Sequence, residues 1–299
     1  MVEIMKKAEM DEIILKKIFG DSAKTSNWFY EKIIGEIGEN KYKYAYLSWE
    51  SIECKLKVGD IAFVNKYMTF EILQRLYLST LTGYLRQCKW KDGICQGIKI
   101  NNYILFSSSA RGFLEASTDF YDALEDIPLA LAENYKLLCN AIAGKVDYEI
   151  ISFKKIEDRL LHFQEANKQN GKSDSNLRPK SAKAYMESRN IKQLDLYECY
   201  NDLCEVTHPA KQSLDLFFEE NNYVLTINLN KDKENIEKFI NKYTTKYAEL
   251  LMRTENLCII IFKVINLFKI DGLYLKAVDQ FDMKDIKLWE KIKTYIDKS

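Results

Sequence analysis

Apolar residues recur along most of the chain at intervals of three and four positions, with polar and charged residues between them. This spacing collects the apolar side chains on one face of a helix, so it predicts a mainly α protein. Helices are predicted at about 2–19, 26–37, 42–56, 67–87, 102–124, 128–144, 149–166, 180–189, 191–208, 210–219, 233–269 and 283–297. The expected architecture is a multi-helix bundle with a long C-terminal spine helix and at most one short strand or hairpin.

Three segments interrupt the helical pattern. Residues 88–97 contain an Asp-Gly turn signal and are predicted as a loop, whereas 223–227 is β-leaning and predicts an isolated strand or an extended connector. A polar run at 167–176 indicates a surface loop or a hinge. We therefore expect an N-terminal helical region over 1–100 and a helical bundle core over 101–299, with a polar hinge loop near 167–179.

The composition narrows the class of protein. The 299 residues, 47% of them hydrophobic, are enough for a sizeable core or two modest ones, and only three prolines and eleven glycines disfavour an all-β fold. Lys and Arg together number 44, as do Asp and Glu, so the chain lacks the basic excess of a protein that relies on phosphate contacts. Nucleic-acid binding would need a local patch.

The cysteines and the N-terminus predict a cytoplasmic protein. Seven cysteines without a repeated short spacing favour free, buried thiols in a reducing compartment. Charged residues interrupt 1–20, so no signal-peptide core is present, and the longest apolar run, Leu257–Phe262, is followed by Lys263. A buried helix is expected there, since a membrane span needs ~20 apolar residues.

Histidine is scarce, because His162 and His208 are the only two in the sequence. His208 lies on the apolar side of the last turn of a predicted helix, and Pro209 disfavours the α conformation for the residue before it. At a helix C-terminus the dipole favours the protonated imidazole, so His208 is a candidate general acid or base, with Glu205 as a partner. The alternative is a partly buried helix cap that bonds a carbonyl group.

Four charged residues share one face of a second helix: Arg111, Glu115, Asp119 and Asp122. In one interpretation Arg111 and Glu115 form an ordinary exposed pair worth ~0.2–0.5 kcal/mol. In the other they form a polar centre inside the bundle that meets His208. Arg111, Glu115 and His208 are therefore the candidate catalytic residues.

Metal and cofactor sites are not predicted. Glu205 and His208 have the spacing of a di-iron motif without its second copy. Cys204 and His208 would need two further ligands to hold zinc, for which Cys88 or Cys95 are the candidates. Glycine-rich phosphate loops are also missing from the sequence.

The segment from Phe106 to Leu216 combines an Arg-Gly-Phe-Leu-Glu helix with a Tyr-x-x-Leu-Cys-x-x-x-His-Pro helix end. In this it resembles a loose group of uncharacterised bacterial all-helical proteins. The resemblance implies a helical bundle and points to Arg111, Glu115 and His208. Some such proteins are thought akin to helical nucleotide-binding-type ribonucleases, but this chain departs from their short Arg-to-His spacing, since Arg189 is the nearest arginine before His208.

Three functions are consistent with these patterns. The first is a soluble helical interaction or regulatory module with a protein partner or a second copy, placed by the resemblance in a bacterial stress or defence system. The second is a metal-independent ribonuclease or phosphodiesterase that uses His208 with Arg111. The third is a small-molecule or nucleotide sensor with an aromatic pocket. The sequence alone does not decide whether the chain is an enzyme. The ribonuclease hypothesis requires Arg111, Glu115 and His208 to meet in one solvent-accessible cleft, whereas the interaction-module hypothesis does not.

Overall fold

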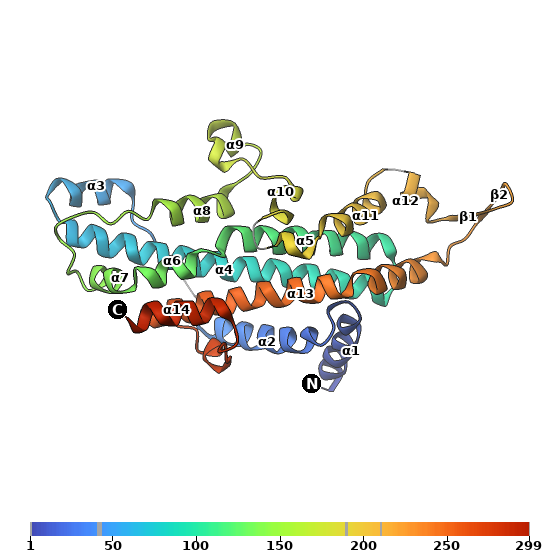
Figure 1. Cartoon of the computed structure of the whole chain (residues 1–299), viewed down its shortest axis with the longest axis horizontal. Helices are drawn as coiled ribbons and strands as arrows, with labels where there is room; N and C mark the ends of the chain where they lie inside the picture. The colour runs from blue at the N-terminus through green and yellow to red at the C-terminus, as the bar shows by residue number, and fades with distance from the viewer. Residues whose placement is uncertain (1, 41–43, 189–190, 210, 299) are drawn as a thin grey trace. The chain divides into compact units, whose positions relative to one another are not determined.

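The computed structural model describes residues 2–40, 44–188, 191–209 and 211–298, and it confirms the mainly α prediction (Figure 1). The α-helices are α1 (Val2–Phe19), α2 (Ser22–Asn40), α3 (Trp49–Lys57), α4 (Ile61–Lys99), α5 (Tyr103–Leu124), α6 (Ile127–Glu133), α7 (Tyr135–Ile142), α8 (Lys154–Glu165), α9 (Asn170–Ser173), α10 (Ala182–Met186), α11 (Tyr197–Thr207), α12 (Lys211–Asp215), α13 (Lys231–Leu267) and α14 (Lys287–Asp297). The 3₁₀ turns are η1 (Ser175–Leu177), η2 (Lys192–Leu194) and η3 (Lys276–Gln280), and the strands are β1 (Phe218–Asn221) and β2 (Val224–Ile227). The long C-terminal helix and the single hairpin predicted from the sequence are both found.

Backbone contacts divide the chain into two compact units, each built from three segments. Unit 1 comprises Met1–Tyr30, Gly83–Asp122 and Lys180–Glu255, and unit 2 comprises Glu31–Thr82, Ala123–Pro179 and Asn256–Ser299. The long helices α4 and α13 contribute residues to both units. The sequence predicted a division at a single point, into 1–100 and 101–299, whereas each unit combines three separate segments of the chain. The predicted domains therefore stay a prediction.

The predicted loop at 88–97 is wrong, because α4 continues through it. Helix α5 packs so closely on this part of α4 that a Cβ atom on Gly97 would lie 2.7 Å from the backbone of Phe106. Cys88, Ile94 and Cys95 are buried in the same stretch. The burial gained by this close packing outweighs the cost of glycine in a helix, which is about 1 kcal/mol.

Aromatic residues form the centre of unit 1. Phe19 and Phe113 meet edge to face with ring centroids 5.1 Å apart, and the Tyr247 ring stacks on Phe113 at 5.8 Å. The buried Tyr247 hydroxyl donates a hydrogen bond to the carbonyl oxygen of Ala110 at 3.0 Å. These contacts join α1, α5 and α13, so they fix how α5 is rotated about its own axis and which of its faces is left for α11.

Unit 1 also buries a charged group. Lys91 and Glu255 are 5% and 6% exposed, with 3.8 Å between the Lys91 ammonium and a Glu255 carboxylate oxygen. Ser26 lies between them, where it accepts a hydrogen bond from Lys91 and donates one to Glu255. Burial raises the pKa of Glu255, and Lys91 opposes that shift. Removing one partner would leave a buried charge without compensation.

In unit 2, one buried asparagine organises the connection between α7 and α8. The Asn65 amide nitrogen donates to the carbonyl oxygens of Val146 and Glu149, and its oxygen accepts from the Ile151 amide at 2.9 Å. Helix α14 packs on α6 and α7 in the same unit (Figure 1). The connection is thus held by a side chain from α4, although it contains no helix of its own.

Several predicted boundaries shift in the structure. The strand predicted at 223–227 pairs with β1 in an antiparallel hairpin, whose turn residues Asn222 and Tyr223 both have positive φ angles, 48° and 67°. Positive φ at both central positions is the geometry of a type I′ turn. Of the helix predicted at 42–56, residues 42 and 43 lie outside the described ranges, and α3 begins only at Trp49. Ser48 caps it by accepting a hydrogen bond from the Ser51 amide.

The polar run at 167–176 lies at the surface of unit 2 and contains α9, with the Asn167 amide donating to the Leu177 carbonyl at 3.1 Å. All seven cysteines are free thiols, as predicted, and Cys54 is exposed while Cys88, Cys95, Cys199 and Cys258 are buried. Within the described ranges, no helix combines the length and the apolar character needed to cross a membrane.

Candidate functional site

Helix α11 carries His208 at its C-terminal end. Cys199, Leu203 and Val206 are its buried residues and attach the helix to the core of unit 1. The helix predicted at 191–208 is shorter in the structure, since α11 begins only at Tyr197. His208 is the C-cap residue with the extended angles φ −96° and ψ 155°, as the following proline requires, and its amide donates to the Cys204 carbonyl at 2.9 Å.

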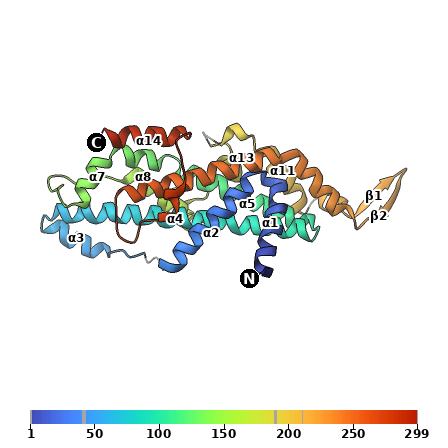
Figure 2. The same cartoon turned by 90° about the horizontal axis from the view of Figure 1, so that it is seen from below.

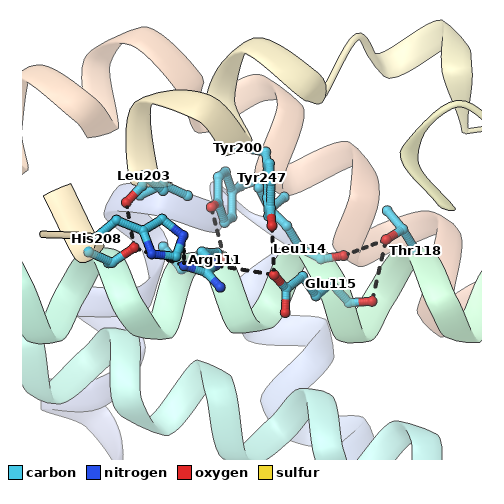
Figure 3. A network of polar contacts seen from close by, with 10 residues as sticks. Arg111, Leu114, Glu115, Thr118, Tyr200, Leu203, His208 and Tyr247 are labelled. Atoms are coloured by element: carbon cyan, nitrogen blue, oxygen red, sulfur yellow. Dashed lines mark hydrogen bonds and ion pairs between the residues drawn. The ribbon is translucent and has the colours of Figure 1, made fainter. Parts of the chain in front are cut away.

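Arg111 from α5 reaches the end of α11. One terminal nitrogen, Nη1, donates to the Thr207 hydroxyl at 3.0 Å and lies 3.2 Å from Nε2 of His208 (Figure 3). The Nε nitrogen of the same guanidinium donates to the Glu115 carboxylate at 3.1 Å. The three residues predicted from the sequence therefore meet, although Arg111 and His208 are 97 positions apart.

The contact between Arg111 and His208 determines which nitrogen of the imidazole carries a proton. A guanidinium only donates hydrogen bonds, so this contact is a hydrogen bond when Nε2 of His208 accepts, which requires the neutral imidazole with its proton on Nδ1. In this state the lone pair of Nε2 points at a cation. The predicted partner Glu205 is exposed, and among the described residues it makes no hydrogen bond to His208.

Tyr200 completes the cluster from the middle of α11. Its hydroxyl donates to the Glu115 carboxylate at 3.1 Å, and its ring lies beneath the Arg111 guanidinium, 5.7 Å from the Cζ atom to the ring centroid. Burial is the largest of the causes that raise the pKa of Tyr200, and Cys204 and Glu115 add to it. The phenol is therefore held as a hydrogen-bond donor beside a carboxylate.

The cluster is open to solvent. His208 is exposed, and the side chains of Arg111 and Glu115 are 25% and 40% exposed. Among the described residues, the second terminal nitrogen of Arg111, Nη2, has no hydrogen-bond partner. An anion approaching from solvent would thus find one unused guanidinium donor next to a neutral imidazole, which is a suitable pair of groups for a phosphate diester.

The other two acids of the predicted stripe each have a cation of their own. Asp119 accepts from Arg86, and Asp122 pairs with Lys180. These two carboxylate side chains are 18% and 17% exposed, so the stripe is half-buried beneath neighbouring elements and not a freely solvated helix face. The stripe therefore ties α5 to other parts of unit 1, and Arg111 with Glu115 is its one pair that also meets a histidine.

Sequence analysis missed the roles of Tyr200 and Thr207. The two residues are seven positions apart, which puts them on one face of a helix, and this spacing was the available signal. Their partners Glu115 and Arg111 come from a distant helix, which no local pattern identifies. Within the part of the chain that the structure describes, no three His, Cys, Asp or Glu side chains are grouped to hold a metal ion. The predicted absence of metal and cofactor stays a prediction.

Unit 2 contains a separate cavity of about 780 Å³ between α6, α7 and the start of α8. Half of its lining residues are aliphatic, and Phe153 is the single aromatic one, in contrast to the aromatic pocket expected of a sensor. Lys155 and Glu149 lie on the wall with opposite charges. Nothing in this lining selects a ligand class.

No family model matches the sequence, and comparisons with curated proteins and with solved structures give no match either. The resemblance to bacterial helical proteins therefore stays a prediction, and function has to be argued from the residues themselves.

Proposed function

We propose that the protein is a metal-independent ribonuclease that cleaves RNA at a phosphodiester bound between Arg111 and His208. The observation that supports this proposal is the meeting of a neutral imidazole with a partly free guanidinium at a place open to solvent. A ribonuclease needs a base for the 2′-hydroxyl and a cation for the charge that develops on phosphorus. This cluster provides one of each.

The proposed step is an internal transesterification. A phosphate oxygen takes the guanidinium donors, so Nη1 of Arg111 leaves Nε2 of His208 and the lone pair becomes available. Nε2 then removes the proton of the ribose 2′-hydroxyl, whose oxygen forms a bond to phosphorus. The bond from phosphorus to the 5′-oxygen breaks, and the imidazolium returns the proton to that oxygen. The products are a 2′,3′-cyclic phosphate and a 5′-hydroxyl.

The surrounding residues have positioning roles in this proposal. Glu115 accepts a hydrogen bond from Nε of Arg111, and the Tyr200 ring lies against the face of the guanidinium. Together they hold the plane of the guanidinium and leave Nη2 free. Thr207 accepts from Nη1 and donates to the Leu203 carbonyl, which keeps the end of α11 beside Arg111. Nη2 is thereby held in a fixed orientation before phosphate binds, and a preorganised donor of this kind contributes strongly to catalysis.

The test is cleavage of an end-labelled single-stranded RNA in the presence of a chelator. We expect the purified full chain to yield a 2′,3′-cyclic phosphate, His208→Ala to lower kcat by roughly 10²- to 10⁴-fold, and Arg111→Met to lower it by roughly 10²- to 10³-fold. His162→Ala is the matched control, since His162 instead contacts the Asn176 carbonyl in unit 2. Cleavage that persists in His208→Ala, or that also acts on DNA, would contradict the proposal.

A second candidate function, the interaction module, is supported by the hairpin in unit 1. Figures 1 and 2 show β1 and β2 projecting beyond the N-terminal end of α13. The exposed apolar side chains in and beside the hairpin are Leu214, Phe217, Tyr223, Val224, Leu225, Ile227 and Leu229. An apolar group of this kind is typical of an association surface. Here the occupant would be a second copy of the chain, in a cytoplasmic setting that the seven free thiols favour.

The charges of the hairpin favour one edge for this association. Strand β1 carries Glu219 and Glu220, whereas β2 carries no charged residue. Two copies joined through β2 avoid opposing like charges. Sedimentation velocity should detect a dimer for the wild type and for the control Ile100→Lys, but a monomer for the doubly substituted Leu225→Lys, Ile227→Lys. A wild type that is monomeric at high concentration would contradict this candidate.

A further inference from the structure

A row of two aromatic rings with a cation at each end extends from the Arg111 cluster along α11 to α10. The Arg111 guanidinium lies over the Tyr200 ring, and the Tyr200 ring lies nearly parallel to that of Tyr197, with centroids 6.4 Å apart and an interplanar angle of 19°. The Lys183 ammonium lies 4.9 Å from the centroid of the Tyr197 ring. The cluster with His208 is therefore one end of a longer surface.

Local structure explains how this row is built. Tyr197 and Tyr200 are three positions apart on α11, so their side chains project from the same side of the helix. Ser181 caps α10 by accepting a hydrogen bond from the Ala184 amide, which places Lys183 in the first turn. The two rings are half-buried and so held in place, whereas the Lys183 side chain is 53% exposed. Its pair with Glu187 is long, at 3.7 Å, and exposed, so it competes weakly with another anion.

We propose that Lys183, Tyr197 and Tyr200 form a binding subsite for single-stranded RNA beside the phosphodiester held by Arg111 and His208. This inference rests on the proposed function and names its substrate class. A base takes the place of the Lys183 ammonium over the Tyr197 ring, and that ammonium moves to the backbone phosphate of the same nucleotide. Protein groups that bind single strands combine a cationic track with aromatic rings, since every unpaired base offers a π-face. A duplex hides those faces in its own stack, so it would not use this subsite.

The balance of charge predicts how this binding depends on salt. The neighbouring cations Arg86 and Lys180 form short ion pairs with Asp119 and Asp122, at 2.6 and 2.5 Å. The Lys183–Glu187 pair is longer, at 3.7 Å, and Arg111 bonds Glu115 through Nε alone, so Lys183 and Arg111 are the two cations expected to meet phosphate. Each phosphate contact on a single strand contributes about −0.7 to the slope of log K against log salt, so two contacts predict a slope of about −1.4. The shallow slope agrees with the zero net charge of the chain.

The test uses fluorescence anisotropy with the full chain and a short labelled oligodeoxyuridylate, which lacks the 2′-hydroxyl and is not cleaved by the proposed step. Tyr197→Leu should weaken binding by about 5- to 150-fold, because it removes one stacked base, and Tyr197→Phe should retain it. Lys183→Met should reduce the salt slope to about −0.7. Lys238→Met is the matched control, since Lys238 forms a comparable exposed i,i+4 pair in unit 1, with Glu234.

The outcomes separate the subsite from the reaction. Equal affinities for the wild type, Tyr197→Leu and Tyr197→Phe would overturn the subsite, and so would an unchanged salt slope in Lys183→Met. If the wild type cleaves RNA and Tyr197→Leu does so with an unchanged KM, the subsite is wrong and the ribonuclease stands. If the oligonucleotide binds through Tyr197 but no RNA is cleaved, the subsite stands and the ribonuclease is wrong.

Discussion

Replacing Arg111 with Met should release the C-terminal end of α11 from α5. The substitution keeps most of the aliphatic stem but removes the guanidinium, and with it the bonds to Glu115, Thr207 and His208. Arg253→Met is a closely matched control, because Arg253 also forms an i,i+4 pair, with Glu249, in the same unit. Its pair has side-chain exposures of 26% and 38%, against 25% and 40% for Arg111 and Glu115.

The comparison sets the bonds of Arg111 to α11 against an i,i+4 pair of similar exposure. The i,i+4 pair is worth about 0.3–0.5 kcal/mol in either variant and largely cancels. A hydrogen bond from a charged group contributes about 1.5–3 kcal/mol when buried, and we take about 1 kcal/mol for each of the two bonds to α11 because the cluster is open to water. Arg111→Met should therefore weaken the attachment of α11 by about 2 kcal/mol more than Arg253→Met does, which corresponds to about 30-fold in an opening equilibrium.

Hydrogen exchange measured by mass spectrometry resolves this effect. Peptides that cover Tyr197–Thr207 should exchange about 30-fold faster in Arg111→Met than in Arg253→Met, while peptides from unit 2 should be unchanged. Local exchange is preferable to a melting temperature, because two units need not unfold in a single transition. A difference in α11 of less than threefold would refute the reasoning, since it would mean that the bonds to Thr207 and His208 hold nothing in place.

Three further predictions concern other parts of unit 1 and the cysteines. Gly112→Ala should destabilise the protein by about 1–3 kcal/mol in urea titration, because a Cβ atom there would lie 2.6 Å from the Trp90 ring. Adding Trp90→Ala to this variant should remove most of the destabilisation. Iodoacetamide should modify the exposed Cys54 in the native protein well before Cys88, because burial raises the pKa of Cys88 to about 11 and little thiolate forms; comparable rates would contradict this. Burial also raises the pKa of Glu255, so the folded state binds this proton more tightly than the unfolded state does, and the protein loses stability as pH rises above about 4.5. Glu255→Gln should flatten this pH dependence in denaturant titrations between acid and neutral pH. An equally steep dependence in Glu255→Gln would contradict the assignment.

The helices that the sequence predicted well are those with a strong apolar period. The expected spine at 233–269 is α13, and the expected helix at 102–124 is α5, because three- and four-residue spacing is a local property that buries one face wherever the helix lies. The Asp-Gly turn at 92–93 failed as a prediction for the opposite reason. In that position glycine permits the close approach of α5, and this contact is visible only once the two helices are packed together.

The candidate residues show the same division. Pro209 set the end of α11 and therefore the extended conformation of His208, since a proline restricts the residue before it. The helical period likewise placed Arg111 and Glu115 on one face of α5. That this face meets His208, that Thr207 and Tyr200 join it, and that Glu205 does not, depends on how the aromatic core of unit 1 rotates α5 and α11 about their axes. Sequence periodicity specifies which residues share a helix face, but packing between helices far apart in the chain decides which two faces touch.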